Sequence, residues 1–213
     1  MCIRDSLMSD HPVVADKVRQ LRATTTTSSD FLRLSHEITR LVAYDALRDL
    51  PTSATTVDTP VIAGAPAREL IEHVIIVPIL RAGLGMSPAV QELIPNHRLC
   101  LVGLRRNEET LLPELYHDGL PADLAGARVI ICDPMLATGG SIVFVLDLLA
   151  RRNAGSVQVL SLIAAQPGVD HVLSAYPDVH ISAAALDERL TDQGYITPGL
   201  GDAGDRLFGA PVR

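Results

Sequence analysis

The segment from residue 129 to residue 141 constrains the fold of this chain more than any other. It begins with four apolar residues, 129–132, which predict a short buried strand, and Asp133 stands at the carboxyl end of that strand. A loop of small residues, 137–141, then leads into an apolar segment, 142–152, which predicts a helix. This order is typical of an open parallel α/β sheet, where ligands bind at the carboxyl ends of strands.

The small-residue loop has the properties of a phosphate site. Gly139 and Gly140 allow backbone N–H groups to approach an anion. Thr138 and Ser141 add hydroxyl groups, and the start of the helix adds a positive dipole end. Asp133 beside such a loop suits a sugar phosphate, because its carboxylate can accept hydrogen bonds from ribose hydroxyls. Neither a P-loop nor a dinucleotide fingerprint fits these residues, and a turn that is Gly-rich only for steric reasons stays open as the alternative.

Composition limits the remaining classes of protein. A chain of 213 residues with 47% hydrophobic residues suits one domain, and its net charge of −7 argues against a nucleic-acid partner. Lys17 is the only lysine, so an anion site must use Arg, backbone amides or a metal ion. Cys100 and Cys132 lie in apolar runs and predict reduced, buried thiols, hence a cytoplasmic location. No apolar run approaches the roughly 18 residues of a membrane span, so we expect no membrane partner.

Apolar strand-like runs alternate with helical segments along most of the chain, which predicts a parallel, doubly wound α/β sheet. The expected strands are residues 74–80, 99–104, 129–132, 157–164 and 180–186. The expected helices are residues 30–49, 87–94, 142–153 and 167–175, with a short hairpin within 52–67. We expect a single domain over residues 11–213, preceded by a disordered or non-native extension over residues 1–10, with Met8 as a candidate natural start.

Three further segments carry candidate functional residues. Residues 78–85 place Arg81 in a second anion-accepting loop at the end of a strand. A polar stretch that includes Arg106 interrupts the α/β alternation and predicts a flexible lid over about residues 105–122. The Gly-rich tail, residues 194–209, suits a backbone that approaches a flat ligand closely. Two anion loops, a lid and this tail together point to 5-phosphoribosyl-1-pyrophosphate (PRPP) as a ligand.

These motifs resemble those of the uracil phosphoribosyltransferases, in the type I phosphoribosyltransferase superfamily. The resembling segments are Pro-Ile-Leu-Arg-Ala-Gly-Leu-Gly at 78–85, Arg-Asn-Glu-Glu-Thr at 106–110, Asp-Pro-Met-Leu-Ala-Thr-Gly-Gly-Ser at 133–141, and the tail at 194–205. The resemblance runs from about residue 11 to residue 209. It implies a C-terminal hood over about residues 187–209 and the conversion of uracil and PRPP to UMP and diphosphate in pyrimidine salvage.

The resemblance also implies roles for individual residues. Asp133, Arg81 and Arg106 are the implied catalytic residues. The implied PRPP site comprises Arg81, Arg106, Asp133, Pro134, Met135, Leu136, Ala137, Thr138, Gly139, Gly140, Ser141 and Asp202. The implied uracil site comprises Ile196, Gly201, Asp202 and Ala203. Asp202 is also the implied metal-facing residue, with Mg²⁺ as cofactor.

The resemblance further implies a homo-oligomer, dimer or tetramer, and makes GTP a candidate effector. The sequence departs from the family pattern at three places: Arg105, Thr197, and Ser29 with Asp30. Two alternative functions stay open from the residues alone. One is an RNA-binding regulator of a pyrimidine operon on the same fold, which would require a basic face, and the other is a phosphoribosyltransferase for another base.

Overall fold

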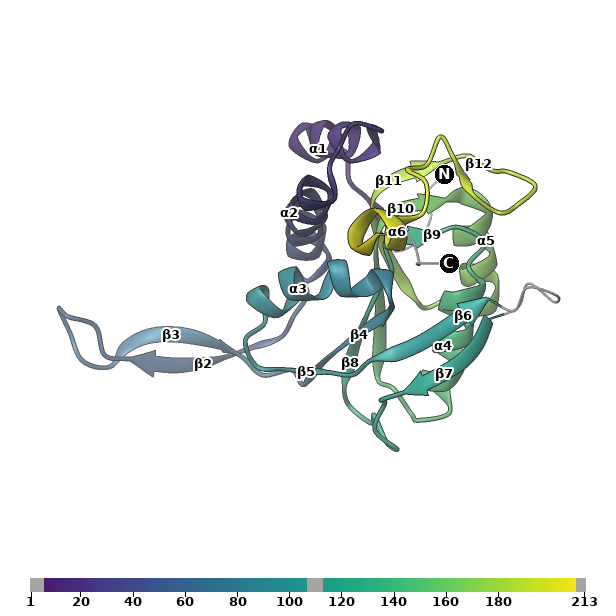
Figure 1. Cartoon of the computed structure of the whole chain (residues 1–213). Helices are drawn as coiled ribbons and strands as arrows, with labels where there is room; N and C mark the ends of the chain where they lie inside the picture. Colours follow the sequence, from purple (N-terminus) through teal and green to yellow (C-terminus); the bar gives the residue numbers. More distant parts are fainter. Residues whose placement is uncertain (1–5, 107–112, 210–213) are drawn as a thin grey trace.

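A mostly parallel sheet forms the centre of the computed structural model, which describes residues 6–106 and 113–209 (Figure 1). The strand order is β1-β11-β10-β8-β4-β6-β7, with β5 beside β4 and β9 beside β10. Among the described strands of this sheet, only β7 runs antiparallel to its neighbour. The predicted α/β class with a parallel sheet is confirmed.

The elements of the described residues are, in chain order, β1 (Ser6–Met8), α1 (Pro12–Arg22), α2 (Ser28–Ala46), β2 (Thr52–Val57), β3 (Ala65–Leu70), β4 (Val74–Leu80), η1 (Ala82–Gly85), α3 (Ser87–Leu93), β5 (His97–Leu99), β6 (Val102–Arg106), β7 (Pro113–Asp118), β8 (Arg128–Cys132), β9 (Met135–Leu136), α4 (Gly140–Ala150), β10 (Ser156–Ala165), α5 (Gln166–Ala175), β11 (His180–Asp187), β12 (Arg189–Leu190), β13 (Ile196–Thr197) and α6 (Ala203–Phe208).

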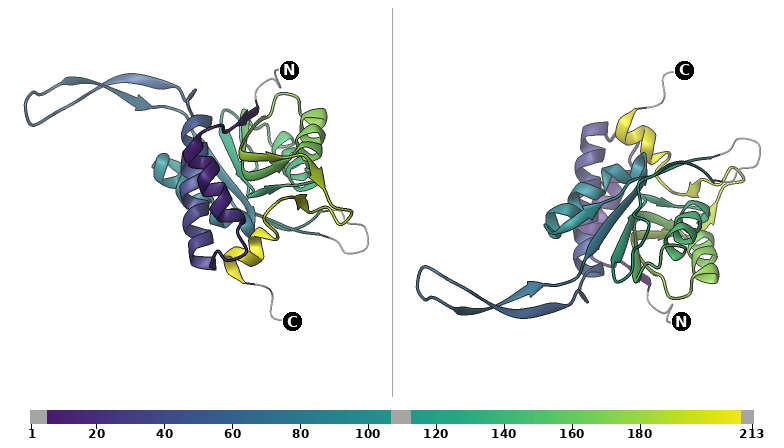
Figure 2. Two further views of the ribbon diagram at one scale, coloured as in Figure 1. Left: turned by 90° about the horizontal axis from the view of Figure 1, so that it is seen from above. Right: turned by 90° about the horizontal axis from the view of Figure 1, so that it is seen from below.

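Helices cover both faces of the sheet, which is why its central strands are apolar on both sides. The helices α1, α2 and α3 pack on one face, and α4 and α5 pack on the other (Figure 2). Helix α1 was not expected from the sequence. Its signal is the spacing of Val14, Val18 and Leu21, which share one helical face and are all buried. The polar residues between them obscure that pattern.

The order of the strands creates a switch point between β4 and β8. After β4 the chain adds β6 and β7 on one side, and it then returns to the other side of β4 to form β8, β10 and β11. The connections from β4 and β8 therefore diverge, which opens a crevice at their carboxyl ends. Arg81 follows β4 directly and Asp133 follows β8 directly, so both lie at this crevice.

The N-terminal segment contributes a strand to the sheet. A disordered or non-native extension was expected over residues 1–10, and within it Ser6–Met8 form an edge strand that pairs with β11 in parallel register. The Ser9 N–H also donates to the Ala183 carbonyl at 3.1 Å. The free edge of β11 offers unpaired backbone groups, and this pairing satisfies them. Residues 1–5 lie outside the described part of the chain.

Two strands occupy part of the segment 105–122, where a lid loop was expected. β6 and β7 pair antiparallel, and Arg105 faces Glu114 across them, with Nε 3.0 Å from the carboxylate. This ion pair gives the unusual Arg105 a structural role. Residues 107–112 lie outside the described residues, so the lid stays a prediction. The strand expected at 99–104 is likewise divided into β5 and β6.

The Gly-rich tail contains a short helix that composition argued against. α6 begins after Asp202, whose Oδ1 accepts the backbone N–H of Asp205 at 2.9 Å and so caps the helix. A comparable cap gives Asp30, one of the departures from the family pattern, a structural role. Thr27 accepts the Asp30 N–H at 3.2 Å and donates to the Asp30 carboxylate at 2.9 Å, which stabilises the start of α2.

The hairpin of β2 and β3 extends away from the body of the molecule (Figures 1 and 2). It was expected within residues 52–67, and the structure confirms it with longer strands. None of the helices in residues 6–106 and 113–209 has the length and apolarity that a membrane span requires.

Candidate active site

The loops that follow β4 and β8 touch each other at Gly83. A Cβ atom at Gly83 would lie 2.3 Å from the backbone carbonyl oxygen of Cys132 and 3.1 Å from Pro78. Only glycine allows so close an approach of two backbones. The loop that carries Arg81 and the strand end that carries Asp133 are therefore held side by side.

Residues 133–141, the phosphate loop, are fixed by neighbouring backbone. The Asp133 N–H donates to the Leu160 carbonyl at 3.1 Å. Gly139 has a φ of 82°, and a Cβ there would lie 2.8 Å from the carbonyl oxygen of Gly168 on α5. His171 on α5 places Nδ1 2.8 Å from the Thr138 carbonyl. The positive φ at Gly139 lets α4 begin at Gly140, so the first turn of α4 faces the crevice.

Burial changes the acidity of two adjacent side chains. It raises the pKa of the Asp133 carboxyl to about 7, and the Met135 N–H, 3.4 Å from Oδ1, opposes this shift only in part. Burial also raises the pKa of the Cys132 thiol to about 12. Cys132 is therefore not a nucleophile near neutral pH, as its place in a buried strand indicated.

Three adjoining cavities meet at Asp133. The first, of about 390 Å³, lies between the phosphate loop and the tail. The second, about 200 Å³, lies between the Arg81 loop and the start of α4, and the third, about 120 Å³, is formed by the phosphate loop itself. Asp133 lines all three. One carboxyl group thus stands where three separately predicted motifs converge.

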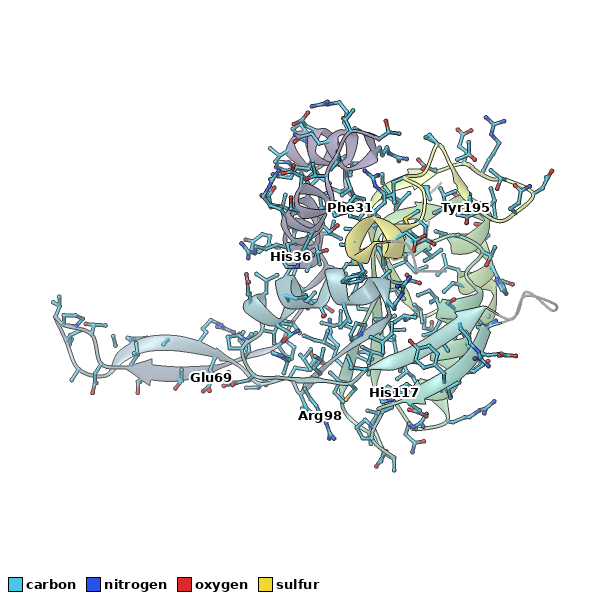
Figure 3. The ribbon with its side chains drawn as sticks, viewed as in Figure 1. Phe31, His36, Glu69, Arg98, His117 and Tyr195 are labelled. Carbon is cyan, nitrogen blue, oxygen red and sulfur yellow. The ribbon has the colours of Figure 1, made fainter. Side chains whose placement is uncertain are left out.

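The tail forms one wall of the first of these three cavities. All four predicted uracil-binding residues line it: Ile196, Gly201, Asp202 and Ala203. Sequence reasoning did not assign Ala82, Gln193 and Gly204, which line it as well, and the half-exposed Tyr195 (Figure 3) lies beside them. Tyr195 and Gly204 lie within the predicted tail and Gln193 directly precedes it, and that position was the available signal.

Arg81 reaches toward the tail. Its Nη2 lies 3.3 Å from Asp205 Oδ1, and this ion pair joins the loop after β4 to α6. Arg81 also lines the second cavity, so its guanidinium stands between the two. The prediction for Arg106 concerns a side chain outside the described residues.

The donor set is suitable for a Mg²⁺ ion that is held mainly by its substrate. Within the described residues no group of three His, Cys, Asp or Glu side chains could form a metal cage. Asp133 and Asp202, however, line the same cavity. Mg²⁺ is commonly bound through one or two carboxylates together with substrate phosphates and water, and these two residues fit that pattern.

Comparisons with known proteins agree with this geometry. A family model described as uracil phosphoribosyltransferase matches residues 8–210. A uracil phosphoribosyltransferase of Symbiobacterium thermophilum is 49% identical over 201 residues, which cover 94% of this chain and 96% of that protein. One of Ureaplasma urealyticum is 42% identical, with 94% and 97% covered. The solved structure of the AQ2163 protein from Aquifex aeolicus has a TM-score of 0.91 at 35% identity, and 98% of this chain and 100% of that one are covered.

Proposed function

Since this chain belongs to the uracil phosphoribosyltransferase family and converts uracil and PRPP to UMP and diphosphate, we propose that the reaction takes place around Asp133. The observation that carries this proposal is the meeting of three cavities at that residue. A substrate with a base, a ribose phosphate and a diphosphate requires three adjoining subsites. The family membership favours this transferase over both the RNA-binding regulator and a transferase for another base.

The phosphate loop holds the ribose phosphate of PRPP. Backbone N–H groups at Gly139 and Gly140 and the hydroxyls of Thr138 and Ser141 bind the 5-phosphate at the start of α4. Pro134, Met135, Leu136 and Ala137 form the rest of the loop and shape its wall. The Asp133 carboxylate accepts hydrogen bonds from the ribose hydroxyls. This contact gains strength as positive charge develops on the ribose in the transition state.

The diphosphate leaves toward the second cavity, which Arg81 lines. Arg106 is predicted to bind it as well. Arg guanidinium groups bind phosphate oxygens through two parallel hydrogen bonds, which neutralises the charge on the leaving group. A Mg²⁺ ion near Asp202 and Asp133 would supply further charge neutralisation of the diphosphate. The protein contributes position and charge, so the transfer needs no covalent nucleophile.

The segment 196–204, which we call the base-reading segment, binds uracil. Its backbone offers donors and acceptors to the two carbonyls and the N–H of the base edge, at Ile196, Gly201, Asp202 and Ala203. Cytosine carries an amino group where uracil has a carbonyl. That exchange leaves buried polar groups unpaired and is expected to lower kcat/KM by at least ~10³.

The experiment that tests this function measures UMP formed from labelled uracil and PRPP, with and without Mg²⁺. We expect Mg²⁺-dependent formation of UMP and equimolar diphosphate, with 5-fluorouracil accepted and with cytosine and hypoxanthine rejected. Equal use of cytosine would contradict the role given to the base-reading segment. Absence of UMP at any Mg²⁺ concentration would contradict the assignment of the reaction itself.

Homo-oligomer formation, as a dimer or tetramer, belongs to the same proposal. The hairpin tip exposes Val61, 93% accessible, and Ile62, and Val57 on β2 is half-exposed. A cavity of about 630 Å³ at the hairpin base is lined mainly by apolar side chains at, or just after, the ends of α2, β3 and α3. Exposed apolar surface of this kind marks contact sites, and a second copy is the occupant we propose. Light scattering on wild type and on Val61→Asp with Ile62→Asp tests it, and a monomeric wild type would overturn it.

Two further features stay proposals. GTP as an effector is tested by the rate of UMP formation with and without GTP. A cytoplasmic location agrees with the buried free thiols of Cys100 and Cys132. A fluorescently tagged chain in the native cell is the corresponding measurement.

A further inference from the structure

The base-reading segment has little regular structure of its own. Between β13 and α6 it forms no helix and no strand, and its shape depends on contacts with other elements. At Gly199 the backbone has a φ of 58°, and a Cβ there would lie 2.1 Å from the Ile196 carbonyl oxygen. The chain therefore folds back on itself between Ile196 and Gly199. Any movement of Gly199 displaces Ile196, which lines the cavity between the phosphate loop and the tail.

One buried ion pair holds both backbone polar groups of Gly199. Asp187, the last residue of β11, is 7% exposed. Its carboxylate accepts hydrogen bonds from Arg22 Nη1 and Nη2, each at 2.7 Å. The Gly199 N–H donates to Asp187 Oδ2 at 2.9 Å, and Arg22 Nη1 donates to the Gly199 carbonyl at 2.7 Å. The guanidinium is planar and forked, so the two parallel contacts fix its orientation as well as its position.

A second arginine ties the same region to α1. Arg206 on α6 donates from Nη1 to the Leu21 carbonyl at 2.7 Å and to the Leu200 carbonyl at 3.1 Å. Its Nη2 donates to the Ala23 carbonyl at 2.7 Å, and its guanidinium lies 4.4 Å from the centre of the Phe31 ring, which is labelled in Figure 3. The carbonyls at the end of α1 have no partner within the helix, and Arg206 satisfies two of them.

From these contacts we infer that Arg22 and Asp187 are positioning residues for uracil, acting through the turn at Gly199. The inference rests on the proposed role of the base-reading segment. Neither side chain lines the cavities that meet at Asp133. The phosphate loop is held by β10 and α5 instead, without α1. Loss of the pair therefore displaces the turn from Ile196 to Gly199. It leaves in place the phosphate loop and also Asp202, which is held by its own cap on α6.

The test compares Arg22→Gln with Arg19→Gln, a matched control on the same helix. Arg19 is exposed, and among the described residues it pairs with Asp16 alone and not with the base-reading segment. At saturating PRPP we expect Arg22→Gln to raise the KM for uracil at least ~10-fold, in line with displacement of a substrate contact by less than 1 Å. The KM for PRPP should stay within threefold of wild type, and Arg19→Gln should match wild type in both constants.

Asp187→Asn extends the test to the partner. Asn still accepts the Gly199 N–H but loses the charge that holds Arg22, so its uracil KM should rise as well. The double variant should be little worse than the more affected single variant, because both remove one interaction. If Arg22→Gln melts below the assay temperature, Arg22→Lys serves in its place, since Lys keeps the charge but not the forked contact. A smaller but still selective rise in uracil KM is then expected.

Two outcomes would overturn the inference: a folded Arg22 variant with the uracil KM of Arg19→Gln, or an equal rise of both KM values. Both outcomes are read against a wild type that forms UMP. A wild type that forms none would instead overturn the proposed function. Melting temperatures of all variants, measured in parallel, separate lost stability from lost positioning.

Discussion

The phosphate loop and the base-reading segment face each other across one cavity, yet they are stabilised in different ways. The phosphate loop lies between β8 and α4 and is fixed by the neighbouring strand β10 and helix α5. The base-reading segment is held by Arg22, which precedes Gly199 by 177 residues. The first region is held by elements that follow it closely in the sequence, whereas the second is held in part by a residue near the other end of the chain. Donor binding and base recognition should therefore respond separately to substitution.

Asp133→Asn should have the largest effect, because it removes the one charged group shared by all three cavities. We expect kcat/KM to fall by roughly 10²–10³, the usual consequence of losing one charged contact to a transition state. Uracil binding should change little, since the base-reading segment is untouched. Steady-state rates with both substrates varied are the measurement. Activity within threefold of wild type would remove Asp133 from the mechanism.

The raised pKa of Asp133 gives a related pH dependence. With a pKa of about 7, the carboxyl of the free enzyme is protonated at lower pH, so kcat/KM for PRPP should fall about tenfold per pH unit well below 7. Between about pH 4 and pH 7 the folded protein binds more protons at this site than the unfolded chain does. Its free energy of unfolding should therefore decrease as pH rises through that window.

Asp133→Asn supplies the control for both parts of the pH prediction. It should lose the rise in rate toward pH 7, and it should lose this contribution to the pH dependence of stability. Rate profiles from pH 5 to pH 9 and urea titrations of the ligand-free protein at pH 5 and pH 8 measure the two effects. A wild-type profile that is flat down to pH 5 would contradict the shift.

Gly201→Val tests the other side of the comparison. Gly201 lines the cavity and has a φ of 82°, and a Cβ there would meet nothing within 4 Å. The added side chain should raise the uracil KM roughly tenfold, a displacement effect, with little change in the KM for PRPP. Gly126→Val is the matched control, because Gly126 has a φ of 74°, is equally open, and lies just before β8 at the amino end of that strand.

Both glycine variants carry the same backbone strain, about 1–2 kcal/mol for a left-handed L-residue. Only Gly201→Val should change uracil recognition. Equal KM values in the two variants would show that strain, and not position, governs the result. A parallel rise in both KM values of Gly201→Val would show instead that the two regions are coupled.

Much of the sheet could be predicted because each central strand is a largely apolar run in the sequence. Residues 74–80 are a continuous apolar run bounded by polar residues, and the structure gives β4 those same bounds. The phosphate loop could be predicted equally well, since its glycines and its acid lie close together in the sequence. α1 was missed because polar residues separate its three buried side chains, and α6 because a cap at Asp202 outweighs the glycines around it.

The contacts of the base-reading segment could not be predicted from the sequence. Arg22 and Asp187 are 165 residues apart, and no local pattern joins them. Their pairing depends on how α1 packs against the end of β11, which is a property of the whole fold. Composition also argued for a long irregular loop at 105–122, because cross-strand pairs such as Arg105 with Glu114 resemble ordinary charged loop residues until the register is known.

Removal of the first seven residues should have the smallest effect. It tests whether the edge strand β1 influences the base-reading segment differently from the phosphate loop. A chain that begins at Met8 loses Ser6 and Leu7 of β1, which pair with Ile181 and Ser182. These partners lie near the start of β11, whereas Asp187, which holds the base-reading segment, ends it. We expect both KM values to stay within twofold of wild type. Each lost backbone hydrogen bond should lower the free energy of unfolding by about 1 kcal/mol. Each kcal/mol should lower the melting temperature by only about 2–4 °C. Calorimetry and steady-state rates on the shortened chain are the measurements. A selective rise in the uracil KM would mean that the edge strand also supports the base-reading segment. Both ends of β11 would then influence base recognition.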